Sequence, residues 1–314
     1  MTKLAFVFPG QGSQSVGMLN PFAGERAVED VMRRASDALG QDLARLIAAG
    51  PASELELTVN TQPCMLAASI AVLECWRAAG GPPPEVVAGH SLGEYSALVA
   101  AGALALEHAV PLVRFRAQAM QEAVPVGTSG MAAILGLDDA QVQQVCAQAS
   151  AELPGEVVEA VNFNAPSQVV IAGHLAALAR ACEIARDAGA KRALALPVSV
   201  AFHSSLLKPA SERLRSRLAE TPVQAPRLPV INNIDVRVES EPERIRDALA
   251  RQVAGPVRWS EIVAGLAAQG VTHIVECGPG KVLTGLNRRI APSLTCLSAS
   301  DPAGLRDALK AVAP

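Results

Sequence analysis

Short apolar runs alternate with longer stretches of helical periodicity along most of this chain. Four of the runs are short enough to form strands: residues 4–8, 85–88, 228–232 and 272–276. Residues 60–79 are apolar on nearly every side, and this predicts a buried helix that opens at the segment Asn60–Pro63. Strands that alternate with helices in this way predict an α/β fold with a mostly parallel sheet.

The stretch from Gly130 to Val198 has a different order of elements. Its periodicity predicts four strands, at residues 131–137, 157–163, 168–172 and 194–198. One helix should follow a cap at Asp138, and a second should cover residues 175–188. The order β-α-β-β-α-β is typical of a ferredoxin-like fold. We therefore expect a ferredoxin-like subdomain, residues 128–198, inserted into a large subdomain of residues 1–127 and 199–314.

A serine stands between a predicted strand and a predicted helix in the segment Val86–Gly102. The local sequence Gly89-His90-Ser91-Leu92-Gly93 has the strand-turn-helix context of a nucleophile elbow, which predicts a hydrolase-like large subdomain. Side chains at Gly89 and Gly93 would collide across so tight a turn. The strained turn would expose the hydroxyl of Ser91 at the positive end of the following helix. The alternative is a serine that merely caps that helix.

An arginine interrupts the apolar face of the next predicted helix. That face is formed by Leu112, Phe115, Ala119, Met120 and Ala123. Arg116 lies in the middle of it, whereas Arg114 points the opposite way. A buried guanidinium needs a partner, because burying it alone costs several kcal/mol. The pattern leaves two partners open: a carboxylate of the protein or an anionic group of a substrate.

Of the five histidines, His203 is the best candidate for a base that activates Ser91. It stands in Val200-Ala201-Phe202-His203-Ser204, at a predicted strand-to-helix junction after the inserted unit. His90, beside the serine, is the next candidate. A cap or core histidine is the alternative for His203, since sequence does not show which residues meet in space. No Asp or Glu stands in a position that identifies it as the third member of a triad.

Composition excludes several classes of protein. The 314 residues carry a net charge of −3, which argues against a generally basic nucleic-acid binder. Six cysteines without a CxxC, and no histidine at metal spacing, indicate reduced buried thiols and no metal site.

Two sequence patterns are incomplete. Ser15 stands where a dinucleotide-binding GxGxxG would need its third glycine, which argues against a nicotinamide site. The apolar runs are too short for a signal peptide or a membrane span, so we expect a cytoplasmic protein.

Seven segments spread over nearly the whole chain resemble malonyl-CoA:acyl-carrier-protein transacylase, in the acyltransferase family of fatty acid and polyketide synthesis. They are FPGQGSQ, GHSLGEYSALVAAG, MQEAVPVGTSGMAAILGL, VNFNAPSQVVIAG, AFHSSLLKPA, GPVRW and ECGPGKVLTGL. The resemblance implies that a malonyl group moves from malonyl-CoA to the phosphopantetheine thiol of an acyl carrier protein, supplying fatty acid synthesis. It implies no cofactor, and we expect a monomer that binds neither nucleic acid nor membrane.

The resemblance also implies roles for individual residues. Ser91 would be acylated, His203 would be the general base, and Arg116 would bind the free carboxylate of the malonyl group. Backbone N–H groups of Gln11 and Leu92 would form the oxyanion hole. The backbone carbonyl of Gln252 would orient the histidine. A carbonyl in that role accounts for the missing acid, because it fixes the tautomer as a carboxylate would.

Three other functions stay open. A discrete acyltransferase of a polyketide synthase is the nearest rival. Similar enzymes that select methylmalonyl tend to carry a polar residue where Leu92 stands and a serine where Phe202 stands, so the resemblance implies a preference for malonyl. A serine thioesterase or esterase shares the elbow but gives no reason for a buried Arg116. A docking module without activity would not need both Ser91 and His203.

Overall fold

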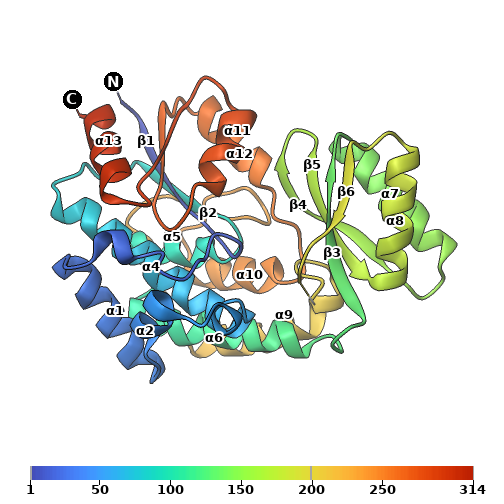
Figure 1. Cartoon of the computed structure of the whole chain (residues 1–314), viewed down its shortest axis with the longest axis horizontal. Helices are drawn as coiled ribbons and strands as arrows, with labels where there is room; N and C mark the ends of the chain where they lie inside the picture. Colours follow the sequence, from blue (N-terminus) through green and yellow to red (C-terminus); the bar gives the residue numbers. More distant parts are fainter. Residues whose placement is uncertain (1, 199, 314) are drawn as a thin grey trace.

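The computed structural model describes residues 2–198 and 200–313, and within them it contains two sheets of different kinds (Figure 1). The first is parallel throughout and runs in the order β7-β2-β1-β8-β9. Its strands are β1 (Leu4–Phe8), β2 (Val86–Gly89), β7 (Val230–Ile231), β8 (His273–Glu276) and β9 (Thr295–Ser298). Parallel strands end at one edge of a sheet, so the segments that follow β1, β2 and β7 lie together.

Both faces of the parallel sheet are buried. Along β1, Phe6 and Phe8 face one core while Ala5 and Val7 face the other. The helices whose buried residues join the core of Phe6 are α1 (Arg26–Leu39), α2 (Leu43–Ala49), α3 (Ala52–Leu55), α4 (Thr58–Ala78), α5 (Gly93–Ala100), α6 (Leu106–Glu122), α9 (Lys208–Glu220), α10 (Pro242–Gln252) and α13 (Pro302–Val312). The opposite core is closed by α11 (Trp259–Ala268) and α12 (Val282–Ile290).

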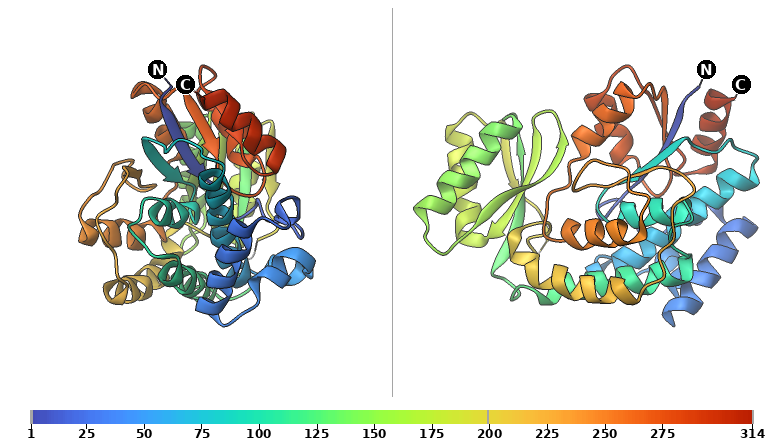
Figure 2. Two further views of the ribbon diagram at one scale, coloured as in Figure 1. Left: turned by 90° about the vertical axis from the view of Figure 1, so that its left-hand side faces the viewer. Right: turned by 180° about the vertical axis from the view of Figure 1, so that it is seen from behind.

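The second sheet is antiparallel and has the order β4-β5-β3-β6. Its strands are β3 (Ser129–Leu135), β4 (Val158–Ala165), β5 (Gln168–His174) and β6 (Arg192–Ala195). Helices α7 (Asp139–Glu152) and α8 (Leu175–Asp187) cover the face that points away from the parallel sheet (Figures 1 and 2). Met131 and Val170, on the other face, pack against Ala201 and Phe202.

Most elements match the sequence expectations. The β-α-β-β-α-β order between residues 129 and 195 is confirmed, and Asp138 caps α7 in a capping box with Gln141. All six cysteines are buried and free. Ser199, where the large subdomain was predicted to resume, lies outside the described residues. No helix in the described ranges is long and apolar enough to cross a membrane.

Two local expectations were wrong, and one strand was missed. Helix α4 begins at Thr58 and holds Pro63 inside it, because the side chain of Asn60 turns back to the carbonyl of Glu54 at 2.8 Å instead of opening the helix. Strand β6 ends at Ala195 instead of reaching residue 198, and its Leu194 is 50% exposed. Strand β9 was not predicted.

Candidate active site

Ser91 lies in a strained turn between β2 and α5. Its φ of 51° is in the left-handed region, which a residue with a Cβ rarely adopts. A Cβ on Gly89 would lie 1.9 Å from the backbone of Gly93, as the sequence led us to expect. A Cβ on Gly93 would instead meet the carbonyl oxygen of Phe8 in β1, at 2.0 Å. Glycine is therefore required at both positions by close backbone approach.

Asn233, in the segment after β7, holds this turn from the side. Its Oδ1 accepts a hydrogen bond from the backbone N–H of Ser91 at 2.7 Å, and its Nδ2 donates to the carbonyl of Gly89 at 2.7 Å. Strain of this kind costs on the order of 1–3 kcal/mol and persists only where neighbouring groups fix the backbone. Asn233 supplies two of the bonds that do so.

His203 is the histidine that meets the serine. Its Nε2 lies 2.7 Å from Ser91 Oγ, and its Nδ1 lies 2.8 Å from the backbone oxygen of Gln252. A carbonyl oxygen only accepts, so Nδ1 carries the hydrogen and Nε2 presents its lone pair to the serine hydroxyl. Burial, and next the nearby Arg116 cation, lower the pKa of His203 to about 3. The imidazole is therefore neutral at pH 7 and able to accept a proton.

The local context of His203 differs from the expectation of a strand-to-helix junction. The residue sits in a turn with a φ of 66°, followed by the short 3₁₀ helix Ser205–Leu207 and then α9. His90, the alternative base, faces elsewhere: its Nε2 lies 2.8 Å from Asn164 Oδ1, and its ring packs on Trp259.

Arg116 is 2% exposed, which confirms the position read from the helical pattern. Within the described residues its hydrogen bonds end on two amide oxygens and one hydroxyl: Gln62 Oε1 at 2.9 Å, Gln252 Oε1 at 2.9 Å and Ser91 Oγ at 3.2 Å. Burial lowers the pKa of the guanidinium. A buried cation with only neutral hydrogen-bond partners is an open position for an anion. Of the two partners that the sequence left open, this favours the anionic group of a substrate.

These groups line a cavity of about 550 Å³ between the two sheets. Gln11 and Leu92 lie on its wall beside Ser91, at the ends of β1 and β2. Met131 and Asn162 reach it from the antiparallel sheet, and Phe202 closes part of it. The side chain of Gln11 donates to Thr58 Oγ1 at 3.3 Å. The structure thus brings together Gln11, Ser91, Leu92, Arg116 and His203, with Gln252 buried directly behind them.

Sequence reasoning missed several residues of this site. Asn233 and Gln62 contact Ser91 and Arg116, and buried Glu94 contacts Gln252 at 2.9 Å. Two of them gave a signal: Gln62 and Glu94 are polar residues inside otherwise apolar helical stretches. Asn233 gave none, because a loop asparagine is ordinary.

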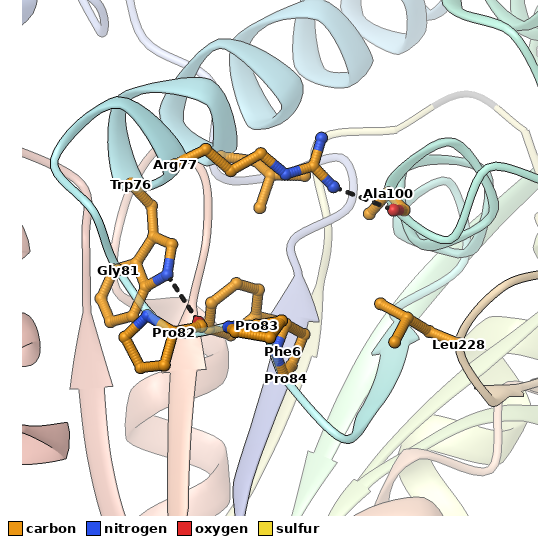
Figure 3. Close-up of a pocket in the computed structure, with 10 residues that line it drawn as sticks. Phe6, Trp76, Arg77, Gly81, Pro82, Pro83, Pro84, Ala100 and Leu228 are labelled. Atoms are coloured by element: carbon orange, nitrogen blue, oxygen red, sulfur yellow. Dashed lines mark hydrogen bonds between the residues drawn. The ribbon is translucent and has the colours of Figure 1, made fainter. Parts of the chain in front are cut away.

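A second hollow, of about 110 Å³, is lined by Phe6 of β1, by residues of α4 and by the segment 81–84, and shares no lining residue with the first (Figure 3). Trp76 Nε1 donates to the carbonyl of Pro82 at 3.0 Å, and Arg77 donates to the carbonyl of Ala100 at 3.1 Å. Apart from these hydrogen-bonded groups its wall is apolar, so we assign this hollow no catalytic or binding role. Among the described residues, no three His, Cys, Asp or Glu side chains are placed to hold a metal ion.

Comparison with known proteins gives a consistent result. Residues 5–293 match the acyl transferase domain family. The chain is 54% identical over 310 residues to the malonyl CoA-acyl carrier protein transacylase of Salmonella typhimurium, covering 98% of this chain and 99% of that protein.

Two solved structures are similar over nearly their whole length. One is the acyl-carrier-protein S-malonyltransferase of Burkholderia pseudomallei, with 65% identity and a TM-score of 0.96, covering 98% of this chain and 100% of that one. The other is a malonyl-transacylase in complex with a type II PKS acyl-carrier protein, with 47% identity and a TM-score of 0.96, covering 99% and 100%.

Proposed function

The chain belongs to the acyl transferase domain family, and from this premise we propose that it transfers malonyl from malonyl-CoA to the phosphopantetheine thiol of an acyl carrier protein. The product feeds fatty acid or polyketide synthesis. The observation that supports this most is the convergence of two groups on one oxygen. Ser91 Oγ lies within hydrogen-bond distance of both the base His203 and the buried cation Arg116.

Acylation of Ser91 follows from this geometry. His203 Nε2 takes the hydroxyl proton while Oγ attacks the thioester carbonyl. The backbone N–H groups of Gln11 and Leu92 hold the oxyanion, each worth about 3 kcal/mol, with Leu92 at the positive end of α5. The C–S bond then breaks, coenzyme A leaves with the proton from Nε2, and malonyl-serine remains.

Deacylation repeats these steps in reverse. The carrier thiol gives its proton to His203 Nε2, and its sulfur attacks the ester carbonyl of malonyl-Ser91. The oxyanion collapses, Ser91 takes the proton, and malonyl-carrier protein leaves. The backbone carbonyl of Gln252 keeps the imidazole in the tautomer that both half-reactions need.

Arg116 is proposed to bind the free malonyl carboxylate by two parallel N–H···O bonds. To do so it gives up its bond to Ser91 Oγ, while the bonds to Gln62 and Gln252 continue to hold the guanidinium. Leu92 and Phe202 line the same cavity. Similar enzymes that select methylmalonyl tend to carry a polar residue and a serine at these two positions, so we propose a preference for malonyl.

The finer architecture is also proposed. We infer a hydrolase-like large subdomain, residues 1–127 and 199–314, built around a nucleophile elbow at Ser91, and an inserted ferredoxin-like subdomain, residues 128–198. The positive φ of Ser91 and the β4-β5-β3-β6 strand order support this. We also propose that the protein acts in the cytoplasm as a monomer, on the sequence considerations above.

Intact-mass measurement after brief mixing with malonyl-, methylmalonyl- and acetyl-CoA tests the proposal. We expect a malonyl adduct on Ser91 that disappears when an acyl carrier protein is added. An adduct that passes to water instead would favour a thioesterase.

A further inference from the structure

A buried carboxylate beneath the serine turn has no part in the chemistry proposed above. Glu94 lies in the first turn of α5 and is 2% exposed. It stands among apolar and small residues, in the sequence Gly93-Glu94-Tyr95-Ser96-Ala97. A carboxylate buried this deeply is costly unless it is well bonded, so its partners should explain its presence.

Two hydrogen bonds meet on one oxygen of this carboxylate. The backbone N–H of Asn233 donates to Glu94 Oε2 at 2.8 Å, and Gln252 Nε2 donates to the same oxygen at 2.9 Å. Asn233 holds the Ser91 turn by its side chain, and Gln252 holds His203 by its backbone oxygen. One buried oxygen of Glu94 therefore binds both the residue that holds the nucleophile and the residue that holds the base.

The same carboxylate selects the orientation of the Gln252 amide. Gln252 Nε2 faces two acceptors, Glu94 Oε2 and the carbonyl of Ser91 at 3.0 Å, while its Oε1 faces Arg116. If the amide were turned over, its oxygen would face two acceptors and its NH₂ group would face a guanidinium. The carboxylate thus keeps an acceptor oxygen against Arg116, and it places a negative charge one amide away from that cation.

We propose that Glu94 is a positioning residue of the acyl transfer reaction: its carboxylate fixes Asn233 and Gln252, and through them Ser91, His203 and Arg116. The inference rests on the proposed function, since it concerns how the groups of that reaction are held.

The charge state of Glu94 makes the inference testable by pH. Burial raises the pKa of this carboxyl to about 7, against the lowering effect of its two hydrogen bonds. The other charged or titratable groups that face it are Arg116 from α6, Asp235 and Glu239 from the segment between β7 and α10, and Tyr95 from its own helix. A raised pKa means that the carboxylate is ionised above about pH 7 and protonated below it. Transfer should therefore decline as the pH falls through this range, where His203 does not titrate.

The experiment compares E94A and E94Q with a matched control, E276Q. Glu276 is a second buried carboxylate whose pKa burial also raises to about 7, but it binds Leu283 and Thr284 at the start of α12, away from the cavity. Malonyl transfer to carrier protein, acetyl acylation of Ser91 and melting temperature are measured for each variant from about pH 5.5 to 8.5.

We expect E94A to lower kcat by about 30-fold or more for both acyl groups, because both depend on Ser91 and His203, and to lower it further for malonyl, which also depends on Arg116. E94Q keeps an acceptor oxygen, so its kcat should fall by only about 3- to 10-fold. Its rate of transfer should show no decline as the pH falls through 7, because the amide does not titrate. E276Q should lower the melting temperature without changing kcat.

Three results would overturn the inference: both Glu94 variants within about two-fold of wild type, an equal loss of kcat in E276Q, or an unchanged pH decline in E94Q. The last measurement decides the matter even if E94A does not fold. Failure of the proposed function itself is distinct, since the wild-type protein would then form no malonyl-serine.

Discussion

Replacing Arg116 with alanine should reverse the acyl preference of the enzyme. In the free protein the guanidinium bonds only neutral oxygens, so removing it breaks no ion pair within the described residues. A bound malonyl carboxylate would then lie in a buried site without its cation. An uncompensated buried charge of this kind costs about 2–4 kcal/mol. At 1.36 kcal/mol for each tenfold in rate, malonyl acylation should fall about 30- to 900-fold.

Acetyl-CoA has no carboxylate, so the same change should leave its reaction intact or improve it. Arg116→Ala removes the N–H donor that lies 3.2 Å from Ser91 Oγ. It also removes the cation that helps to lower the pKa of His203. The histidine becomes a stronger base as a result. Arg116→Lys restores the charge without the planar fork and should recover only part of malonyl acylation.

The assay measures malonyl and acetyl acylation of Ser91 side by side, by intact mass, together with the melting temperature. Arg114→Ala is the matched control, because Arg114 lies on the same helix but donates to Gln41 and Asn60 on the opposite side. The control should leave the ratio of malonyl to acetyl acylation unchanged. Parallel losses for both acyl groups in Arg116→Ala, with a lowered melting temperature, would refute the carboxylate-binding role.

Three further predictions concern the dyad and the carrier protein. Ser91→Ala should form no malonyl ester, and an adduct that survives the substitution would show that another residue is acylated. His203→Ala should lose about 10²-fold or more in transfer with CoA binding nearly unchanged, whereas a loss of only a few-fold would require another base. Lys191 and Arg192 are exposed and shortly precede the cavity-lining residues 196–198, so we expect them to attract the acidic carrier protein. Reversing both charges should raise KM for the carrier protein but not for malonyl-CoA, and equal effects on both substrates would show that they do not bind the carrier protein.

Most elements of the fold could be predicted from the sequence because their causes are local. The apolar run of β1, the Asp138 cap and the two glycines around Ser91 act over a few residues, and each lies where it was expected. The burial of Arg116 was also predictable, because helical periodicity fixes which face of α6 a residue occupies. Strand β9 and the start of α4 were missed, since pairing partners and a side chain that turns back to Glu54 decided them.

The site's supporting contacts were decided only by the tertiary structure. His203 reaches Ser91 across 112 residues of sequence, and Asn233 reaches Ser91 across 142. Glu94 and Gln252 are 158 residues apart. No local pattern encodes such distances, because the partners lie on separate elements that meet only in the folded chain: Ser91 and Asn233 follow β2 and β7, Gln252 ends α10, and His203 precedes α9. The sequence by itself therefore determined which residue types were available for the chemistry. The packing of α4, α5 and α10 against the parallel sheet decided which buried oxygens and nitrogens hold those residues in place.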